Sequence, residues 1–143
     1  MTMTQLRGAL IGCGFFAINH LQGWRDAAGA EIVAICDTNP ERLAIAGDSF
    51  GIMRRYAEAD AMLRAERPDF VDIATTAPSH RPLVELAAGL GIPVIVQKPF
   101  ATALADAKAM VQACKAAGVP LMVHENFRWQ SPMLEDAGAY KAQ

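Results

Sequence analysis

Short apolar runs alternate along the chain with longer segments in which apolar residues recur every three or four positions. The runs at 6–12, 30–37, 69–75, 93–97 and 119–125 are predicted strands, and 54–56 is a shorter one. The segments at 15–28, 40–50, 58–65, 79–90 and 102–117 are predicted helices. We expect Ser79 and Thr102 to begin the last two helices, because short polar side chains cap backbone N–H groups.

The predicted strands are continuously apolar and do not alternate with polar residues, which is typical of strands buried on both faces. Strand–helix alternation then implies right-handed crossovers. The sequence therefore predicts an α/β fold, a doubly wound and mostly parallel sheet of the Rossmann type in a three-layer α/β/α arrangement. Ligands of such sheets bind beyond the carboxyl ends of the strands, so the residues after each strand are the candidates for function.

A glycine-rich turn follows the first strand and opens the first helix. Gly12 and Gly14, with Ala17, form the GxGxxG/A pattern. Gly12 permits a tight turn, Gly14 leaves room for a pyrophosphate, and Ala17 allows helix and strand to pack closely. Phe15 and Phe16 fill the variable positions, where the helix N-terminus offers N–H groups to phosphates. The pattern favours nucleotide binding, although a merely tight turn is the alternative.

Asp37 ends the second strand, 20 residues after Ala17. An acid at this place accepts hydrogen bonds from the adenosine ribose hydroxyls and repels a 2′-phosphate. No arginine follows at 38 or 39, and Arg42 lies inside the next helix. We therefore expect NAD in preference to NADP. Asp37 could also cap the helix that starts at Asn39-Pro40, and both roles are compatible.

Composition narrows the class of protein. The 143 residues are 52% hydrophobic and 20% charged, as in one globular domain. A net charge of −2 gives no electrostatic reason to expect nucleic acid or an anionic membrane. Three cysteines without CxxC spacing fit a reducing, cytoplasmic location, with Cys13 and Cys36 as core residues. We expect neither a signal peptide nor a membrane span.

Several of these segments together resemble one family of enzymes. They are Gly12 to Ala17, His20, Asp37, Thr75 to His80 and Gln97-Lys98-Pro99, and the resemblance runs from about residue 6 to about residue 132. Their order and spacing are similar to those of the Gfo/Idh/MocA oxidoreductases. The resemblance implies hydride transfer between a nicotinamide dinucleotide and a secondary alcohol of a sugar, an inositol or a related polyol.

The resemblance gives Lys98 the catalytic role. In the family this strand ends in Glu-Lys-Pro, where the lysine reaches the nicotinamide ribose and the substrate hydroxyl and helps with proton transfer. The residues agree, because a lysine at the ligand edge of a parallel sheet can be partly desolvated and Pro99 fixes the backbone beside it. A solvated lysine in a turn is the alternative. Gln97 replaces the family's glutamate, which keeps hydrogen bonding and removes a negative charge near the lysine.

The resemblance also implies further cofactor contacts in the loop after residue 75, beside Lys98, and after the last strand. These residues are Thr75, Thr76, Pro78, His80, Gln97, Asn126 and Arg128. The loop departs from the family's usual Thr-Pro, because Thr76 follows Thr75. We expect structural roles for His20 and His80, and no metal site, since no third ligand lies near them in sequence. A general base is the alternative for His124, for which we also expect a structural role.

The domain organisation predicted from the resemblance is a dinucleotide-binding domain at 1–125 and a crossover at 126–143 toward a substrate domain that the chain lacks. A truncated product, an isolated domain and one half of a two-chain enzyme all fit this length. Apolar surface left uncovered would favour a homo-oligomer. The alternatives to an oxidoreductase domain are a non-catalytic NAD-binding or sensor module, and a methyltransferase, which needs no strand-end Lys-Pro.

Overall fold

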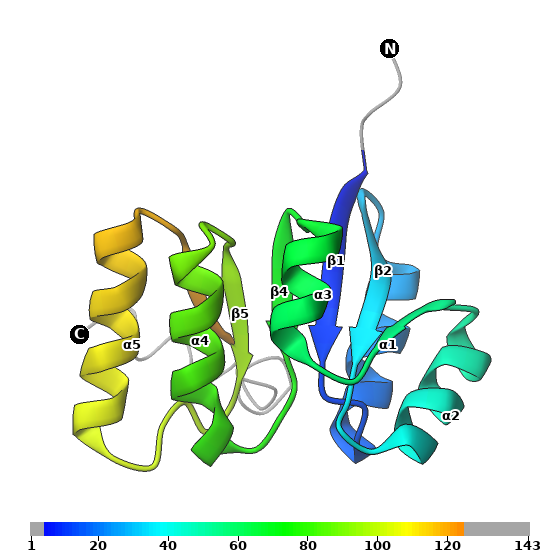
Figure 1. The fold of residues 1–143 in the computed structure, drawn as a ribbon, viewed down its shortest axis with the longest axis horizontal. Coiled ribbons are helices and arrows are strands. Elements are labelled where there is room, and N and C mark those ends of the chain that lie inside the picture. Colours follow the sequence, from blue (N-terminus) through cyan, green and yellow to red (C-terminus); the bar gives the residue numbers. More distant parts are fainter. Residues whose placement is uncertain (1–4, 125–143) are drawn as a thin grey trace, which may run out of the picture.

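The protein is described by a computed structural model for residues 5–124, and these residues form one twisted sheet flanked by helices (Figure 1). All six strands are parallel, in the order β3-β2-β1-β4-β5-β6. The strands are β1 (Leu6–Ile11), β2 (Ala30–Cys36), β3 (Arg54–Tyr56), β4 (Phe70–Ile73), β5 (Val94–Gln97) and β6 (Leu121–His124). The helices are α1 (Phe15–Asp26), α2 (Pro40–Phe50), α3 (Ala59–Glu66), α4 (His80–Gly89) and α5 (Leu104–Ala117), with a 3-10 turn at Ala77–Ser79. The predicted Rossmann fold is confirmed.

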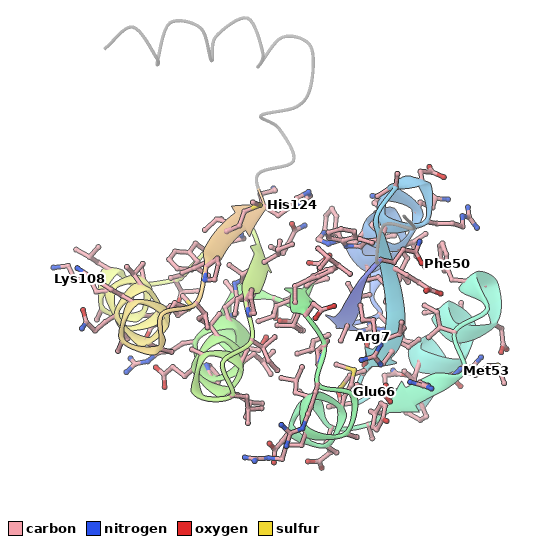
Figure 2. The ribbon with its side chains drawn as sticks, turned by 90° about the horizontal axis from the view of Figure 1, so that it is seen from above. Arg7, Phe50, Met53, Glu66, Lys108 and His124 are labelled. Atoms are coloured by element: carbon pink, nitrogen blue, oxygen red, sulfur yellow. The ribbon has the colours of Figure 1, made fainter. Side chains whose placement is uncertain are left out.

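Two apolar cores lie on the two faces of the sheet. One joins the strands to α3, α4 and α5, through residues such as Met62, Val84 and Met110. The other joins them to α1 and α2, through residues such as Leu21 and Ala46. Seen from above, α1 lies on one face while α3, α4 and α5 lie along the other (Figure 2). The strands are buried on both faces where the two cores overlap, which explains their continuous apolar sequences.

The centre of the sheet is packed closely at β4, whose four residues are all buried. Its neighbour β1 carries Gly8 opposite Phe70 in the register. A Cβ at Gly8 would lie 2.3 Å from the Phe70 ring, so the glycine makes room for the aromatic side chain. Within residues 5–124, no helix is both long and apolar enough to cross a membrane.

Two of the predicted helix caps are wrong. The chain is still extended at Ala103, so α5 begins at Leu104, two residues after the predicted start, and Thr102 does not cap it. Asn39 caps α2, because its side-chain oxygen accepts hydrogen bonds from the N–H groups of Glu41 and Arg42. Asp37 therefore does not cap that helix directly, although its Oδ1 accepts from the Asn39 N–H.

The predicted start of α4 at Ser79 is correct in position but not in mechanism. Ser79 precedes the helix, yet its side chain accepts no N–H from the first turn. The hydroxyl instead bonds back to the Thr75 hydroxyl, at 2.6 Å, and to the Thr76 carbonyl, at 2.8 Å. The intervening 3-10 turn brings these atoms together, so Ser79 closes the loop that precedes α4.

Candidate functional site

The carboxyl ends of β1, β2, β4 and β5 open onto a cavity of about 1050 Å³. Its walls come from segments that lie far apart in the sequence, as expected for the ligand edge of a doubly wound sheet. The predicted residues that line it are Gly12, Gly14, Phe15, Phe16, Asp37, Thr75, Thr76, Gln97 and Lys98. Most of the candidates named from the sequence therefore meet in one place.

The turn between β1 and α1 is built as its sequence pattern requires. Gly12 has φ +98°, and a Cβ there would lie 2.9 Å from Thr75 Cγ2 and 3.0 Å from the Ala74 carbonyl carbon. Glycine is therefore needed both for the backbone conformation and for the close approach of the neighbouring loop. Gly14 precedes α1 without any side-chain cap, so the helix start is open to an anion. Ala17 is fully buried, which lets α1 pack against the sheet.

Asp37 joins the ends of β1 and β2. Its Oδ2 accepts the Cys13 backbone N–H at 2.7 Å, and its Oδ1 accepts the Asn39 N–H at 2.7 Å. These bonds hold the half-buried carboxylate in a fixed orientation. A carboxylate has about four acceptor positions, so lone pairs remain for two ribose hydroxyls.

Arg42 lies inside α2, as predicted, and it also lines the cavity, which was not predicted. The first turn of α2 carries its side chain back over the glycine turn, where a Cβ at Gly14 would lie 3.9 Å from Arg42 Nη1. The signal for it was available, since Arg42 follows the Asn39 cap by three residues and so lies on the first helical turn.

Lys98 is half-buried at the end of β5 and joins Pro99 through a cis peptide bond. It lines the same cavity as the glycine turn. Gln97, directly before it, is almost completely buried, and its Oε1 accepts a hydrogen bond from His124 Nδ1 at 3.2 Å. The amide that replaces the family's glutamate is therefore a part of the interior beside Lys98.

The loop after β4 is held in place by His80. This side chain is fully buried, and its Nδ1 and Nε2 lie 3.0 Å from the Phe100 carbonyl oxygen and 2.9 Å from the Thr75 carbonyl oxygen. It thus joins the loop after β4 to the loop after β5. Pro78 and His80 are not among the residues that line the cavity, so their contact with a cofactor stays a prediction.

The remaining candidates lie in the core or beyond the described part. Cys13 and Cys36 are buried, and desolvation, followed by the nearby charge of Asp37, raises the pKa of Cys13 to about 12 and that of Cys36 to about 11. Both are core thiols, as predicted. Between residues 5 and 124, no three His, Cys, Asp or Glu side chains are grouped so as to hold a metal ion. Asn126 and Arg128 fall outside that range.

Comparison with known proteins identifies the family. The sequence model of the Gfo/Idh/MocA group, described as an oxidoreductase family with an NAD-binding Rossmann fold, matches residues 6–125. D-apiose dehydrogenase of Paraburkholderia graminis is 66% identical over 137 residues, which are 96% of this chain and 36% of that protein. Inositol 2-dehydrogenase of Acidothermus cellulolyticus is 30% identical over 82% of this chain and 35% of its own length.

Solved structures give the same result. An oxidoreductase from Agrobacterium radiobacter, in complex with NAD+, L-tartaric acid and magnesium, superposes with a TM-score of 0.92 at 57% identity. The match covers 97% of this chain and 41% of that one. The WlbA dehydrogenase of Bordetella pertussis, with NADH and UDP-GlcNAcA, has a TM-score of 0.89 at 34% identity over 96% of this chain and 42% of its own. The chain thus spans about two fifths of these relatives, and it belongs to the Gfo/Idh/MocA oxidoreductase family, whose members share an NAD-binding Rossmann fold.

Proposed function

We propose that the cavity at the carboxyl edge of the sheet binds NAD, and that the chain is the cofactor half of an enzyme that oxidises a secondary alcohol of a sugar-like substrate. The observation that carries this proposal is the arrangement of the glycine turn, Asp37 and Lys98 along one cavity. The three features correspond to the phosphates, the adenosine ribose and the nicotinamide end of a dinucleotide.

The residues fit such a cofactor. The uncapped start of α1 offers N–H groups and a partial positive charge to the pyrophosphate, and Gly14 leaves the approach open. The fixed carboxylate of Asp37 is placed to accept the hydroxyls of the adenosine ribose. A 2′-phosphate there would meet a negative charge, and this supports NAD over NADP. Arg42 lies close enough to the turn to contact the phosphates or the adenine.

Lys98 is the residue proposed for proton transfer. When bound, the dinucleotide supplies a nicotinamide ring that accepts or donates hydride. Oxidation of a secondary alcohol also releases the hydroxyl proton, which a neutral Lys98 amine would take up at Nζ; in the reverse direction the ammonium would return it. The half-buried position of Lys98 keeps it at the cavity wall, where a substrate hydroxyl could reach it.

The substrate class is inferred from relatives. The names D-apiose dehydrogenase and inositol 2-dehydrogenase both denote enzymes that act on small polyhydroxylated molecules. Since this chain spans 36% and 35% of those two proteins, we propose that the rest of the substrate pocket comes from chain outside the described residues or from a partner. A sugar or inositol as substrate, and an oligomeric assembly, follow from this reasoning as expectations.

The test is a titration of the purified chain with NADH and then NADPH, followed by nicotinamide fluorescence and calorimetry. We expect saturable binding of NADH and weaker binding of NADPH. Asp37→Asn keeps the side-chain shape and removes the charge, so it should lower the preference for NADH about tenfold, or about 1.4 kcal/mol. Asp48→Asn is the matched control, because Asp48 is an exposed acid on α2 that pairs with Arg55 away from the cavity lining.

Two results would contradict the proposal. One is binding of neither dinucleotide, and the other is an equal effect of the Asp37 and Asp48 variants. Turnover assays with sugars and inositols then separate an enzyme domain from a non-catalytic NAD-binding module, since a module binds NADH without oxidising or reducing any of them.

A further inference from the structure

A buried polar cluster lies on the face of the sheet that α1 covers. We call it the His20 cluster, and its members are His20, Asp72, Gln97 and His124. They come from α1, β4, β5 and β6. His20, Asp72 and Gln97 are all at least nine-tenths buried. Burying polar groups in a core destabilises the fold unless they form hydrogen bonds, so the position of this cluster calls for an explanation.

The members form a continuous chain of contacts. His20 Nδ1 donates to Asp72 Oδ2 at 2.7 Å, and Trp24 Nε1 donates to the same oxygen at 2.8 Å. The His20 ring lies against the ring of His124, with 4.7 Å between the centroids. His124 Nδ1 in turn donates to Gln97 Oε1 at 3.2 Å. The chain of contacts therefore runs from α1 across three strands to the residue directly before Lys98.

The pairing inside the cluster is incomplete. His20 Nε2 and Asp72 Oδ1 are the buried side-chain atoms of residues 5–124 that have no hydrogen-bond partner. Burial works to lower the pKa of His20, but its hydrogen bond to Asp72 and the charge of that carboxylate outweigh this and raise the pKa above the ordinary value. The Gln97 side chain also raises this pKa, and the ring of His124 on β6 lies against His20.

The geometry places this cluster directly behind Lys98. Gln97 pairs with His124 in the register of β5 and β6, at the last position of each strand. The next residue is Lys98, and the backbone then turns through the cis peptide into Pro99. The Gln97 side chain, bonded to His124, is therefore the point at which this cluster meets the segment that leads into Lys98.

We propose that His20 is a positioning residue for Lys98. Asp72 holds the ring of His20, and this ring fixes the position of His124. His124 in turn fixes Gln97. Gln97 fixes the end of β5, so that Lys98 is held at the nicotinamide end of the cavity. This inference rests on the proposed function, since it assumes that a dinucleotide occupies the cavity with its nicotinamide near Lys98. It assigns to the buried His20–Asp72 pair a role beyond filling the core.

The test uses the whole 143-residue chain and two ligands, NADH and ADP-ribose, which lacks the nicotinamide. His20→Asn keeps an N–H donor near the position of Nδ1 but removes the ring and its second nitrogen. We expect it to weaken NADH binding about three- to tenfold and to change ADP-ribose binding less than twofold. Asp72→Asn, of the same shape as the native residue, should act in the same way and serves as a second variant. Glu66→Gln, at a buried carboxylate far from the cavity, is the control and should change neither.

A double-mutant cycle separates positioning from general stability. Lys98→Ala should weaken NADH binding, and adding His20→Asn to it should have little further effect if His20 acts through Lys98. The inference is overturned if His20→Asn weakens both ligands equally, or if the two substitutions act independently. In either case wild-type NADH binding stands and so does the proposed function. If the wild-type chain binds neither ligand, the proposed function fails and this inference fails with it.

Discussion

Two buried carboxylates, Glu66 and Asp72, lie toward opposite ends of the same sheet and differ in their hydrogen-bond partners. Glu66 is near the amino-terminal ends of β1 and β3, where Figure 2 shows it beside Arg7. Asp72 is near the carboxyl ends, behind the candidate site. Both are inaccessible, at 9% and 1% exposure. The difference lies in how completely each is hydrogen-bonded.

Glu66 is fully engaged. Its Oε1 accepts from Arg54 Nη1 at 2.9 Å and from Arg7 Nη2 at 3.2 Å, and its Oε2 accepts from the Tyr56 hydroxyl. Arg7 also donates to the Glu66 backbone carbonyl. A carboxylate satisfied in this way joins β1, β3 and α3 and leaves no polar atom open to a ligand. Its role is to hold the elements together.

Asp72 has both of its donors on one oxygen, and its other oxygen and the far nitrogen of His20 remain unpartnered among residues 5–124. Natural proteins keep few such atoms, and each of them calls for an explanation. Burial alone therefore does not show whether a carboxylate stabilises the fold or supports a functional site. The completeness of the hydrogen bonding differs between the two, and we propose a stabilising role for the end of the sheet near Glu66 and a functional role for the end near Asp72.

The largest loss of stability and of NADH binding is expected for a substitution in the glycine turn, at the carboxyl ends of the strands. Gly12→Ala combines a left-handed backbone with a Cβ 2.9 Å from Thr75, so we expect a loss of about 2–4 kcal/mol in unfolding free energy and no NADH binding. Gly91→Ala is the matched control, because Gly91 also has a positive φ of 73° but has open space around its Cβ position. It should lose only about 1 kcal/mol and bind NADH normally, as urea unfolding and fluorescence titration would measure.

An intermediate loss of stability is expected at the amino ends of the strands, near Glu66. Glu66→Gln removes the charge that pairs with Arg7 and Arg54, and both arginines are partly exposed, which reduces the penalty. We expect a loss of about 1–2 kcal/mol in unfolding free energy with NADH affinity unchanged. A change in the NADH dissociation constant without a change in stability would contradict the separation of the two ends.

The smallest effects are expected in the dependence of stability on pH, and they have opposite signs. The hydrogen bond from Tyr56, and after it the two arginines, lower the pKa of Glu66 below its ordinary 4.5 despite burial. Glu66 therefore contributes to the stability of the fold above that pH, and this contribution is lost as pH falls through the lowered pKa of the folded state. The raised pKa of His20 gives a contribution that is complete below its ordinary 6.5 and is lost as pH rises through the folded value.

Melting temperatures measured across pH test this directly. We expect Glu66→Gln to flatten the acid side of the wild-type profile and His20→Asn to flatten the alkaline side. If His20→Asn changed the acid side instead, the raised pKa of His20 would not account for its part in stability.

Much of this arrangement could be predicted from the sequence. Continuous apolar strands, the Gly12 to Ala17 pattern and the acid at 37 led to the fold and to most of the cavity lining, because each depends on local spacing. The contacts of His20 with Asp72 and of Gln97 with His124 could not be predicted, since they join residues 52 and 27 positions apart. The prediction that Thr102 caps α5 was wrong, because the chain stays extended through Ala103. The contact of Arg42 with the site was not predicted, because it depends on how the first turn of α2 directs this side chain over the glycine turn.

We infer that the carboxyl end of the sheet binds the dinucleotide, with the nicotinamide near Lys98. A second cavity, of about 670 Å³, lies toward the amino end and is lined by residues that include Arg7, Phe50 and Met53, all labelled in Figure 2. The most direct measurement is a map of backbone amide NMR shifts on titration with NADH and with ADP-ribose. We predict that both ligands shift residues 12–17 and Asp37, and that NADH alone shifts residues 97–98 and His124. Shifts confined to the second cavity, or no difference between the ligands at Lys98, would contradict the account.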